Sequence, residues 1–380
     1  MKKWLPWRQS KVEAVVLGIT NASSMGWAAS QLETDKLAVQ QLRDDQHHLY
    51  FIVSGPRLNP VALKDDPDTG GWILDVDHTT AEGQGMTSVP VPRTAFPGHS
   101  LTLAKGGLSI VSDGDANARQ RREVTPAEVV RAALRVQGVA TKTKPQRYFP
   151  ERHIRYEMVD GVETLISVED IPADDPVTRG VDPGEDWVNS IVDALFIFDV
   201  IYIGQAYGTE GARTAIDRLS AHEKAQPAIA YVHDYQPDMS VGFITINQRM
   251  TSVDKLNIDS PQGRPDKNSL SEWVKEQADV LNEPLSATTV DAAESVLIGA
   301  FKPPRNQAKT NFSNRTKSVK ELRKLGYTHL QVRIDLQDSF AKLRGPNNEA
   351  STNHNLTFNL KTRELESPGD TGWNEFLTDH

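Results

Sequence analysis

The chain has 380 residues, of which 38% are hydrophobic and 24% charged, and its formal net charge is −9. This balance is typical of a soluble globular protein with two or three domains, and the acidic total excludes a protein that is basic over its whole surface. No apolar run approaches the roughly 18–20 residues that cross a bilayer, and the lack of cysteine excludes disulfides, thiolate metal ligands and cysteine nucleophiles. Without an apolar signal segment near its start, the chain is expected to be cytoplasmic and not to contact a membrane.

Residues 1–170 are expected to form a β-rich N-terminal domain. Short runs of branched and aromatic residues, such as His48–Val53 and Trp72–Val76, are bounded by Gly, Pro, Asn and Asp. A helix is marked by Thr125, Pro126 and Glu128, which have the spacing of a capping box with proline at the first helical position. The role of this domain stays open between regulation, assembly into a homo-oligomer and target recognition.

Residues 171–186 are rich in acidic residues and proline and are expected to form an exposed linker. A compact α+β domain is expected at 187–340, with an insertion at 251–290 that contains its own helix near Ser269–Leu281. A C-terminal strand and tail fill 341–380. The expected order in the α+β domain is strand, strand, helix, strand, helix.

The first two strands of this domain are expected to form a tight hairpin, because the apolar runs Ala194–Phe198 and Val200–Ile203 are separated by Asp199. Gly204 ends the second run. Thr214 can cap a helix over Ala215–Ala225. The third strand and the second helix follow at Ser240–Ile246 and Asp291–Phe301.

Polar residues recur at the ends and faces of these elements. Tyr202 ends the second strand, and Arg218 and His222 lie four residues apart and so share a helix face. Glu294 lies on the second helix, and Asn306 follows that helix. An arginine, a histidine and a strand-end tyrosine together suit the binding of a phosphodiester.

These residues resemble the motifs of the GIY-YIG nuclease superfamily. Tyr202-Ile203-Gly204 is similar to the second motif, and the segment from Glu294 to Asn306 is similar to the Glu-x-x-Leu-Ile, Lys-Pro and Asn pattern of that family. The resemblance covers roughly residues 190–310 and implies a small mixed sheet flanked by helices. It also implies a metal-dependent endonuclease that hydrolyses phosphodiester bonds in DNA, an activity that suits bacterial restriction or anti-phage defence.

The resemblance implies a role for each matching residue. Glu294 would bind one Mg²⁺ or Mn²⁺, and Arg218 would hold a nonbridging phosphate oxygen. Tyr202 would orient or deprotonate the attacking water, and His222 would assist proton transfer or hold Tyr202. Asn306 would fix the loop after the second helix and contact a phosphate.

The first motif of the superfamily, Gly-Ile-Tyr, has no literal counterpart. Ala194-Leu195-Phe196 is the nearest positional match, and Phe196 lacks the hydroxyl that the family uses. Tyr207, in the loop after the second strand, is a candidate for the missing hydroxyl.

A basic run begins near Asn306. Between Lys302 and Lys324 there are eight Lys or Arg residues against one acid, Glu321. This run is either a solvated helix face or a surface that follows a phosphate backbone. The candidate nucleic-acid contacts are Arg213, Tyr207, Lys302, Arg305 and Lys309.

Two further functions stay open. Loss of the first tyrosine motif favours a catalytically inactive module that binds nucleic acid with the same surface. A structural or assembly protein is the third hypothesis.

Overall fold

The computed structural model describes residues 12–28, 47–80, 83–104, 107–113, 121–141, 152–159, 162–170, 183–207, 214–220, 225–256, 286–306, 317–324, 327–336, 339–346 and 348–366. Over these residues the protein is mixed α+β. The chain divides into two compact units. The first unit consists of Met1–Leu58, His78–Gly85 and Val192–Pro368, and it therefore joins N-terminal strands to the region with the candidate site.

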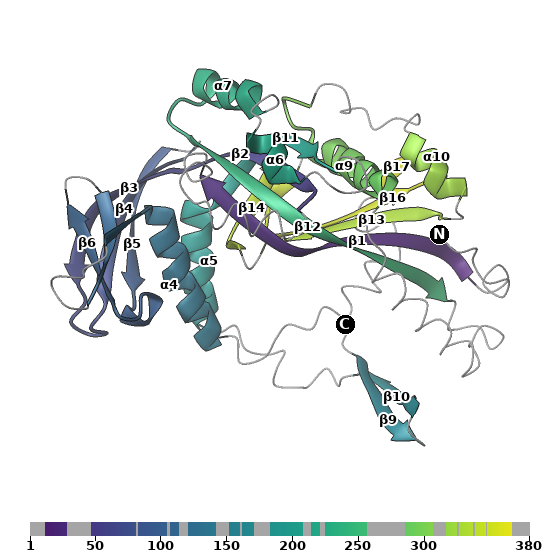
Figure 1. Ribbon diagram of the computed structural model, residues 1–380, viewed down its shortest axis with the longest axis horizontal. Coiled ribbons are helices and arrows are strands. Elements are labelled where there is room, and N and C mark those ends of the chain that lie inside the picture. Colours follow the sequence, from purple (N-terminus) through teal and green to yellow (C-terminus); the bar gives the residue numbers. More distant parts are fainter. Residues whose placement is uncertain are drawn as a thin grey trace. The chain divides into compact units, whose positions relative to one another are not determined.

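A nine-stranded sheet organises the first unit (Figure 1), and its strand order is β15-β14-β11-β2-β12-β1-β13-β16-β17. The sequence-based division at residues 171–186 separates strands that pair in this sheet, because β1 and β2 precede that segment and the other seven strands follow it. The bounds are β1 Val12–Ala28, β2 Leu49–Gly55, β11 Ile197–Gln205, β12 Ser240–Leu256, β13 His329–Asp335, β14 Lys342–Gly345, β15 Asn348–Ser351, β16 Asn353–Asn359 and β17 Glu364–Glu366.

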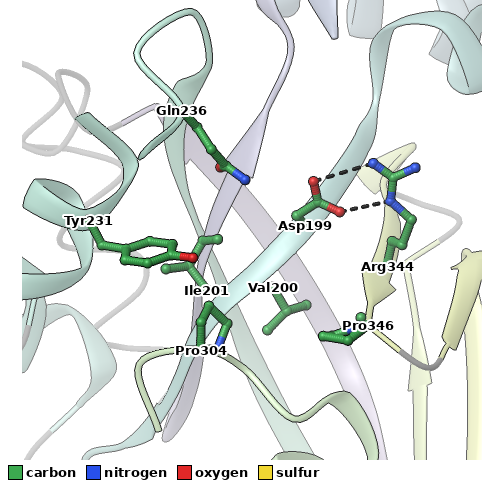
Figure 2. Close-up of a pocket in the computed structure, with 9 residues that line it drawn as sticks. Asp199, Val200, Ile201, Tyr231, Gln236, Pro304, Arg344 and Pro346 are labelled. Carbon is green, nitrogen blue, oxygen red and sulfur yellow. Dashed lines mark hydrogen bonds and ion pairs between the residues drawn. The ribbon is translucent and has the colours of Figure 1, made fainter. Parts of the chain in front are cut away.

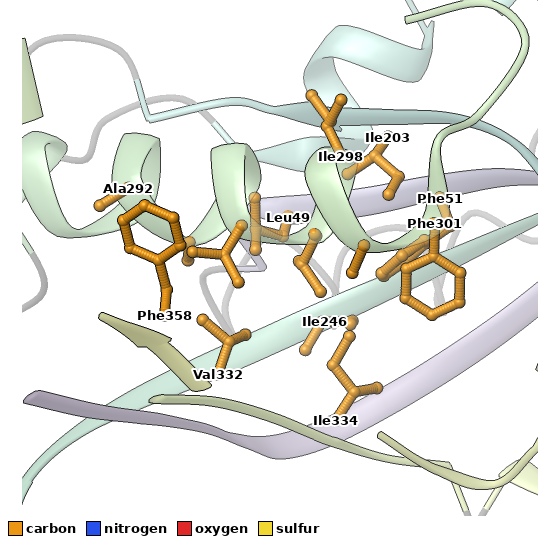
Figure 3. Close-up of a cluster of buried hydrophobic side chains, with 14 of the residues drawn as sticks. Leu49, Phe51, Ile203, Ile246, Ala292, Ile298, Phe301, Val332, Ile334 and Phe358 are labelled. Atoms are coloured by element: carbon orange, nitrogen blue, oxygen red, sulfur yellow. The ribbon is translucent and has the colours of Figure 1, made fainter. Parts of the chain in front are cut away.

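Strand β2 is fully buried, with all seven of its residues buried. Successive side chains of a strand point to opposite faces, so β2 contributes to two clusters. Leu49, Phe51 and Val53 pack in the cluster that contains α9 (Ala287–Phe301) and α10 (Lys317–Lys324) (Figure 3). Tyr50 and Ile52 pack in the cluster that contains α6 (Ala215–Ser220) and α7 (Ala225–Tyr235).

Helix α9 begins four residues before the predicted Asp291. Ser286 caps it by accepting a hydrogen bond from the backbone N–H of Thr289 at 3.2 Å. The helix ends as predicted at Phe301, where Lys302 adopts the left-handed conformation (φ 45°) and Pro303 cannot continue the helix. Its two ends are therefore set by local signals.

The predicted hairpin at 194–203 is wrong. Pro183–Leu195 forms helix α5, and Ile197–Gln205 is one continuous strand, β11. Asp199, interpreted as the turn, lies within β11, where Arg344 of β14 contacts its carboxylate at 2.7 and 3.3 Å. The antiparallel partner of β11 is β2, about 140 residues earlier in the chain.

Other predicted elements are longer or divided. The third strand runs on to Leu256 as β12, and helix is observed at Ala215–Ser220 and again at Ala225–Tyr235. The predicted helix near Ser269–Leu281 and most of the predicted linker lie outside the described residues.

The second unit contains most residues of two three-stranded sheets, whose strand orders are β3-β4-β5 and β6-β7-β8. Helix α4 (Pro126–Thr141) begins with the predicted capping box, because Glu128 N–H donates to Thr125 Oγ1 at 3.2 Å and Thr125 N–H donates to Glu128 Oε2 at 2.7 Å. In the part of the chain that the structure describes, no helix has the length and apolarity needed to cross a membrane. The remaining bounds are β3 Arg57–Asp65, β4 Trp72–Thr80, β5 Gly83–Val91, a 3₁₀ turn Arg93–Ala95, β6 His99–Ala104, β7 Gly107–Ser112, β8 Arg121–Val124, β9 Arg152–Val159 and β10 Val162–Asp170.

Candidate active site

Tyr202 of β11 lies beside a second tyrosine, Tyr50 of β2. The strands are antiparallel, with Gly204 opposite Tyr50 and Tyr202 opposite Ile52. The two tyrosine ring centroids are 6.1 Å apart, and the side chains are hydrogen bonded. Burial is the largest cause that raises the pKa of Tyr50, and the neighbouring Tyr202 adds to it, so Tyr50 keeps its proton. Strand β2 thus places a second tyrosine beside Tyr202.

Gly204 is required at this point by close packing. A Cβ at Gly204 would lie 2.4 Å from Cζ and 2.5 Å from the hydroxyl oxygen of Tyr50, and 2.7 Å from Cε1 of Tyr202. These distances are shorter than any normal contact between heavy atoms. The glycine of the Tyr-Ile-Gly sequence therefore leaves room for both tyrosine rings.

Two charged residues act on the Tyr50 hydroxyl. Burial is the largest cause of its raised pKa, followed by the neighbouring Tyr202. Arg218 opposes this shift, and Glu294 adds to it. Glu294 is carried by α9, which packs in the cluster on the other face of β2, and its effect on Tyr50 is smaller than those of Tyr202 and Arg218. Tyr50, Tyr202, Arg218 and Glu294 are therefore electrostatically coupled.

Helix α6 carries Arg218 and begins at a capping box. Both the backbone N–H and the hydroxyl of Thr214 donate to the Asp217 carboxylate, at 3.1 and 2.8 Å. Arg218 Nη1 donates to the backbone oxygen of Gln205 at 2.6 Å, which fixes the guanidinium at the end of β11.

Gln205 and Asp291 extend this support to the second helix. Gln205 Nε2 donates to Asp291 Oδ1 at 3.1 Å, and Ser318 Oγ of α10 donates to Asp291 Oδ2 at 2.7 Å. Hydrogen bonds thus join α6, β11, α9 and α10 around the candidate site. Sequence reasoning assigned no role to either residue.

Asn306 holds the strand that carries Tyr202. Its Oδ1 accepts from Ile203 N–H and its Nδ2 donates to Ile203 C=O, both at 2.7 Å. Arg305 N–H also donates to Ile201 C=O at 3.1 Å. The segment after α9 therefore pairs with β11 on the side away from β2, and Asn306 positions Tyr202 through the backbone of the next residue.

Glu294 is the predicted metal ligand, and only 6% of its surface is exposed to solvent. Among the described residues, no group of three or more His, Cys, Asp or Glu could hold a metal ion. One carboxylate fits Mg²⁺ or Mn²⁺ when water and phosphate oxygens complete the shell, whereas a metal held by protein ligands alone does not fit.

The remaining predicted residues are distributed around this centre. Lys302 and Arg305 are exposed, and the Arg305 guanidinium lies 5.9 Å from the ring centroid of Tyr231. The Tyr207 ring lies 4.9 Å from the His48 ring, while the tyrosine ring next to Tyr202 is that of Tyr50, with the centroids 6.1 Å apart. His222, Arg213 and Lys309 lie outside the described residues.

Ala194-Leu195-Phe196 is not the first-motif strand. Ala194 and Leu195 belong to α5, and Phe196, which is 1% exposed, follows that helix directly. The run His48–Val53, which contains Tyr50, predicted the strand that is observed as β2. Its pairing with β11 was not visible because the two strands are far apart in sequence.

Comparison of the chain with protein-family models, curated proteins and solved structures finds no match.

Proposed function

We propose that this protein is a metal-dependent endonuclease of the GIY-YIG type, whose first tyrosine strand is β2. The observation that carries the proposal is the Tyr50–Tyr202 pair on adjacent antiparallel strands, coupled to Arg218 and Glu294. The sequence contained five of the expected groups, Tyr202, Arg218, His222, Glu294 and Asn306, but lacked a tyrosine on the partner strand. Tyr50 supplies that group, which removes the main argument for an inactive module.

The tyrosine pair suits activation of a water nucleophile. Tyr50 keeps its proton because burial raises its pKa, and a hydrogen bond from Tyr50 would stabilise negative charge on the Tyr202 oxygen. Once Tyr202 has released its own proton to solvent, its phenolate oxygen would take a proton from the attacking water. The roles of the two tyrosines therefore differ.

Arg218 and Glu294 suit the phosphate and the leaving group. Arg218 uses Nη1 to hold Gln205, but a guanidinium has five N–H donors and can also bind a nonbridging phosphate oxygen. Glu294 would hold Mg²⁺ or Mn²⁺. When bound, the ion would stabilise charge on the phosphorane and on the leaving 3′ oxygen.

Exposed cations near this centre suit a DNA backbone. Lys302 and Arg305 follow α9, and the Lys and Arg residues of α10 (317, 320, 323 and 324) are exposed while Ser318, Val319 and Leu322 are buried. Helix α10 is thus a solvated basic face, and such a face can also contact phosphates.

A plasmid-nicking assay with Mg²⁺ or Mn²⁺ tests the proposal. Glu294→Ala should remove metal-dependent nicking, while Glu349→Ala, which removes an exposed carboxylate on β15, should leave it unchanged. Tyr50→Phe should reduce the rate by about 100-fold or more because a hydrogen-bond donor is lost. Tyr235→Phe removes an exposed hydroxyl and is the matched control.

The assay also separates the other functions. Equal nicking by the parent chain and Glu294→Ala would show that the metal site is wrong. Salt-sensitive DNA binding without nicking would indicate an inactive binding module. Absence of binding at low salt would favour a structural or assembly protein.

A further inference from the structure

A pocket of about 440 Å³ is lined by residues of β11 and β14 of the large sheet and by Pro304, in the segment that holds Tyr202 (Figure 2). Strand β14 pairs with β11 over Ile197–Asp199, and farther along β11 Arg305 and Asn306 pair with Ile201 and Ile203. The pocket lies where the pairing of β11 with β14 ends and its pairing with Arg305 and Asn306 begins. A volume of this size is at the lower end for small-molecule sites and suits one nucleotide unit, not a duplex.

One wall of the pocket is aromatic. Tyr231 of α7 lines it, and the Arg305 guanidinium lies 5.9 Å from the centroid of the Tyr231 ring. The Tyr235 ring lies 4.8 Å from that of Tyr231 with an interplanar angle of 32°. A tyrosine ring beside an arginine is the usual surface on which a nucleobase stacks.

The opposite wall is an ion pair, and an amide lies between the two walls. Asp199 and Arg344 are joined by hydrogen bonds of 2.7 and 3.3 Å. Figure 2 shows the Gln236 side chain between Tyr231 and this pair. Within the described part of the chain, the buried Gln236 Oε1 has no hydrogen-bond partner. An unsatisfied buried acceptor is costly, so a ligand that offers an N–H next to an acceptor gains a bond at this point.

We propose that this pocket binds one unstacked nucleobase, with the ring on Tyr231 and the base edge on Gln236. A glutamine amide matches a base that presents a donor beside an acceptor, as adenine does. The base comes from a nucleic-acid strand or from a free nucleotide. The strand source rests on the proposed function, and it places an extruded base beside the cutting site.

The geometry supports a link between the pocket and the candidate active site. Pro304 lines the pocket, and two residues later Asn306 holds Ile203 beside Tyr202. Tyr231 packs against the same cluster as Tyr50 and Tyr202. A base held on Tyr231 therefore shares a face of the sheet with the tyrosine pair, which would fix the register of the bound strand.

Fluorescence titration of 2-aminopurine tests the proposal on the full chain carrying Glu294→Ala, which prevents cutting. The probes are a single-stranded oligonucleotide with one 2-aminopurine and free 2-aminopurine nucleoside monophosphate. Stacking should quench at least one probe. Adding Tyr231→Ala should weaken that binding about 5- to 100-fold, whereas Tyr231→Phe should keep most of it. Gln236→Ala should weaken it less and should reduce the preference for 2-aminopurine over a pyrimidine.

The outcomes separate the sources and the failures. Quenching of the oligonucleotide alone identifies a strand, and quenching by the monophosphate identifies a free nucleotide. Equal loss in Tyr235→Ala and Tyr231→Ala would place stacking on the outer face of α7 and overturn the pocket. Binding without any Tyr231-dependent quenching would also overturn it, while Glu294-dependent nicking by the parent chain would leave the proposed function standing. Tyr231-dependent quenching in a protein that never nicks DNA would support the base-binding pocket and contradict the proposed function.

Discussion

Replacing Gly204 with alanine tests the packing that places Tyr50 beside Tyr202. The new Cβ would lie 2.4 Å from Tyr50 Cζ and 2.7 Å from Tyr202 Cε1, and the Tyr50 side chain has little room to retreat because the residue is 1% exposed. Overpacking of this kind costs about 1–3 kcal/mol, so the free energy of unfolding measured by urea denaturation should fall by that amount. The DNA-cutting rate should also fall by about 100-fold, since the displaced Tyr50 can no longer donate to Tyr202.

The control is the same substitution in a chain that already carries Tyr50→Ala. Tyr50→Ala alone should cost about 3–5 kcal/mol because it leaves a cavity. In that background Gly204→Ala gains room, and its own cost should fall by about 1–2 kcal/mol, which is the coupling energy of the pair. Equal costs of Gly204→Ala in the two backgrounds would refute the contact between Tyr50 and Gly204, and with it the assignment of Tyr50 to the site.

Three further predictions concern the supports of the sheet. Asn306→Ala leaves both backbone groups of Ile203 without their 2.7 Å partners and should lower the free energy of unfolding, measured by urea denaturation, by about 2–5 kcal/mol. A loss below about 1 kcal/mol would contradict this pair of hydrogen bonds. Ser286→Ala removes the cap of α9 and should cost about 1 kcal/mol, whereas Ser286→Asp should retain most of it. Burial lowers the pKa of His354 from 6.5 to about 4, so the folded protein keeps it neutral while the unfolded chain gains a proton below pH 6.5. Stability should therefore fall by about 3 kcal/mol as the pH drops from 6.5 to 4, and His354→Phe should remove that slope in urea titrations at several pH values.

Features set by short-range signals could be predicted from the sequence. The capping box at Thr125 and the end of α9 at Phe301 depend on residues within one helical turn. The polar residues on and after α9 could be recognised for the same reason. Glu294 and Asn306 are separated by one helix end, so their spacing is fixed locally.

Features set by pairing between distant strands could not be predicted. Asp199 has the sequence signature of a turn, but its carboxylate is accommodated within β11 by Arg344, 145 residues later. The strand that contains Tyr50 could be recognised from the sequence, but an apolar strand sequence does not indicate which other strand it pairs with. Pairing between distant strands thus explains both the position of Tyr50 beside Tyr202 and the error in the predicted hairpin.

The position of β2 has a consequence for biosynthesis. This strand becomes an interior strand of the sheet, between β11 and β12, but β11 begins about 140 residues later in the chain and β12 later still. At roughly 5–20 residues per second, a ribosome needs about 7–30 s to make the intervening chain. During that interval the segment Leu-Tyr-Phe-Ile-Val has neither of its partners in the sheet, and such a segment is prone to self-association. The nascent chain should therefore depend on chaperones until β11 and β12 emerge, and slower translation should lower its soluble yield.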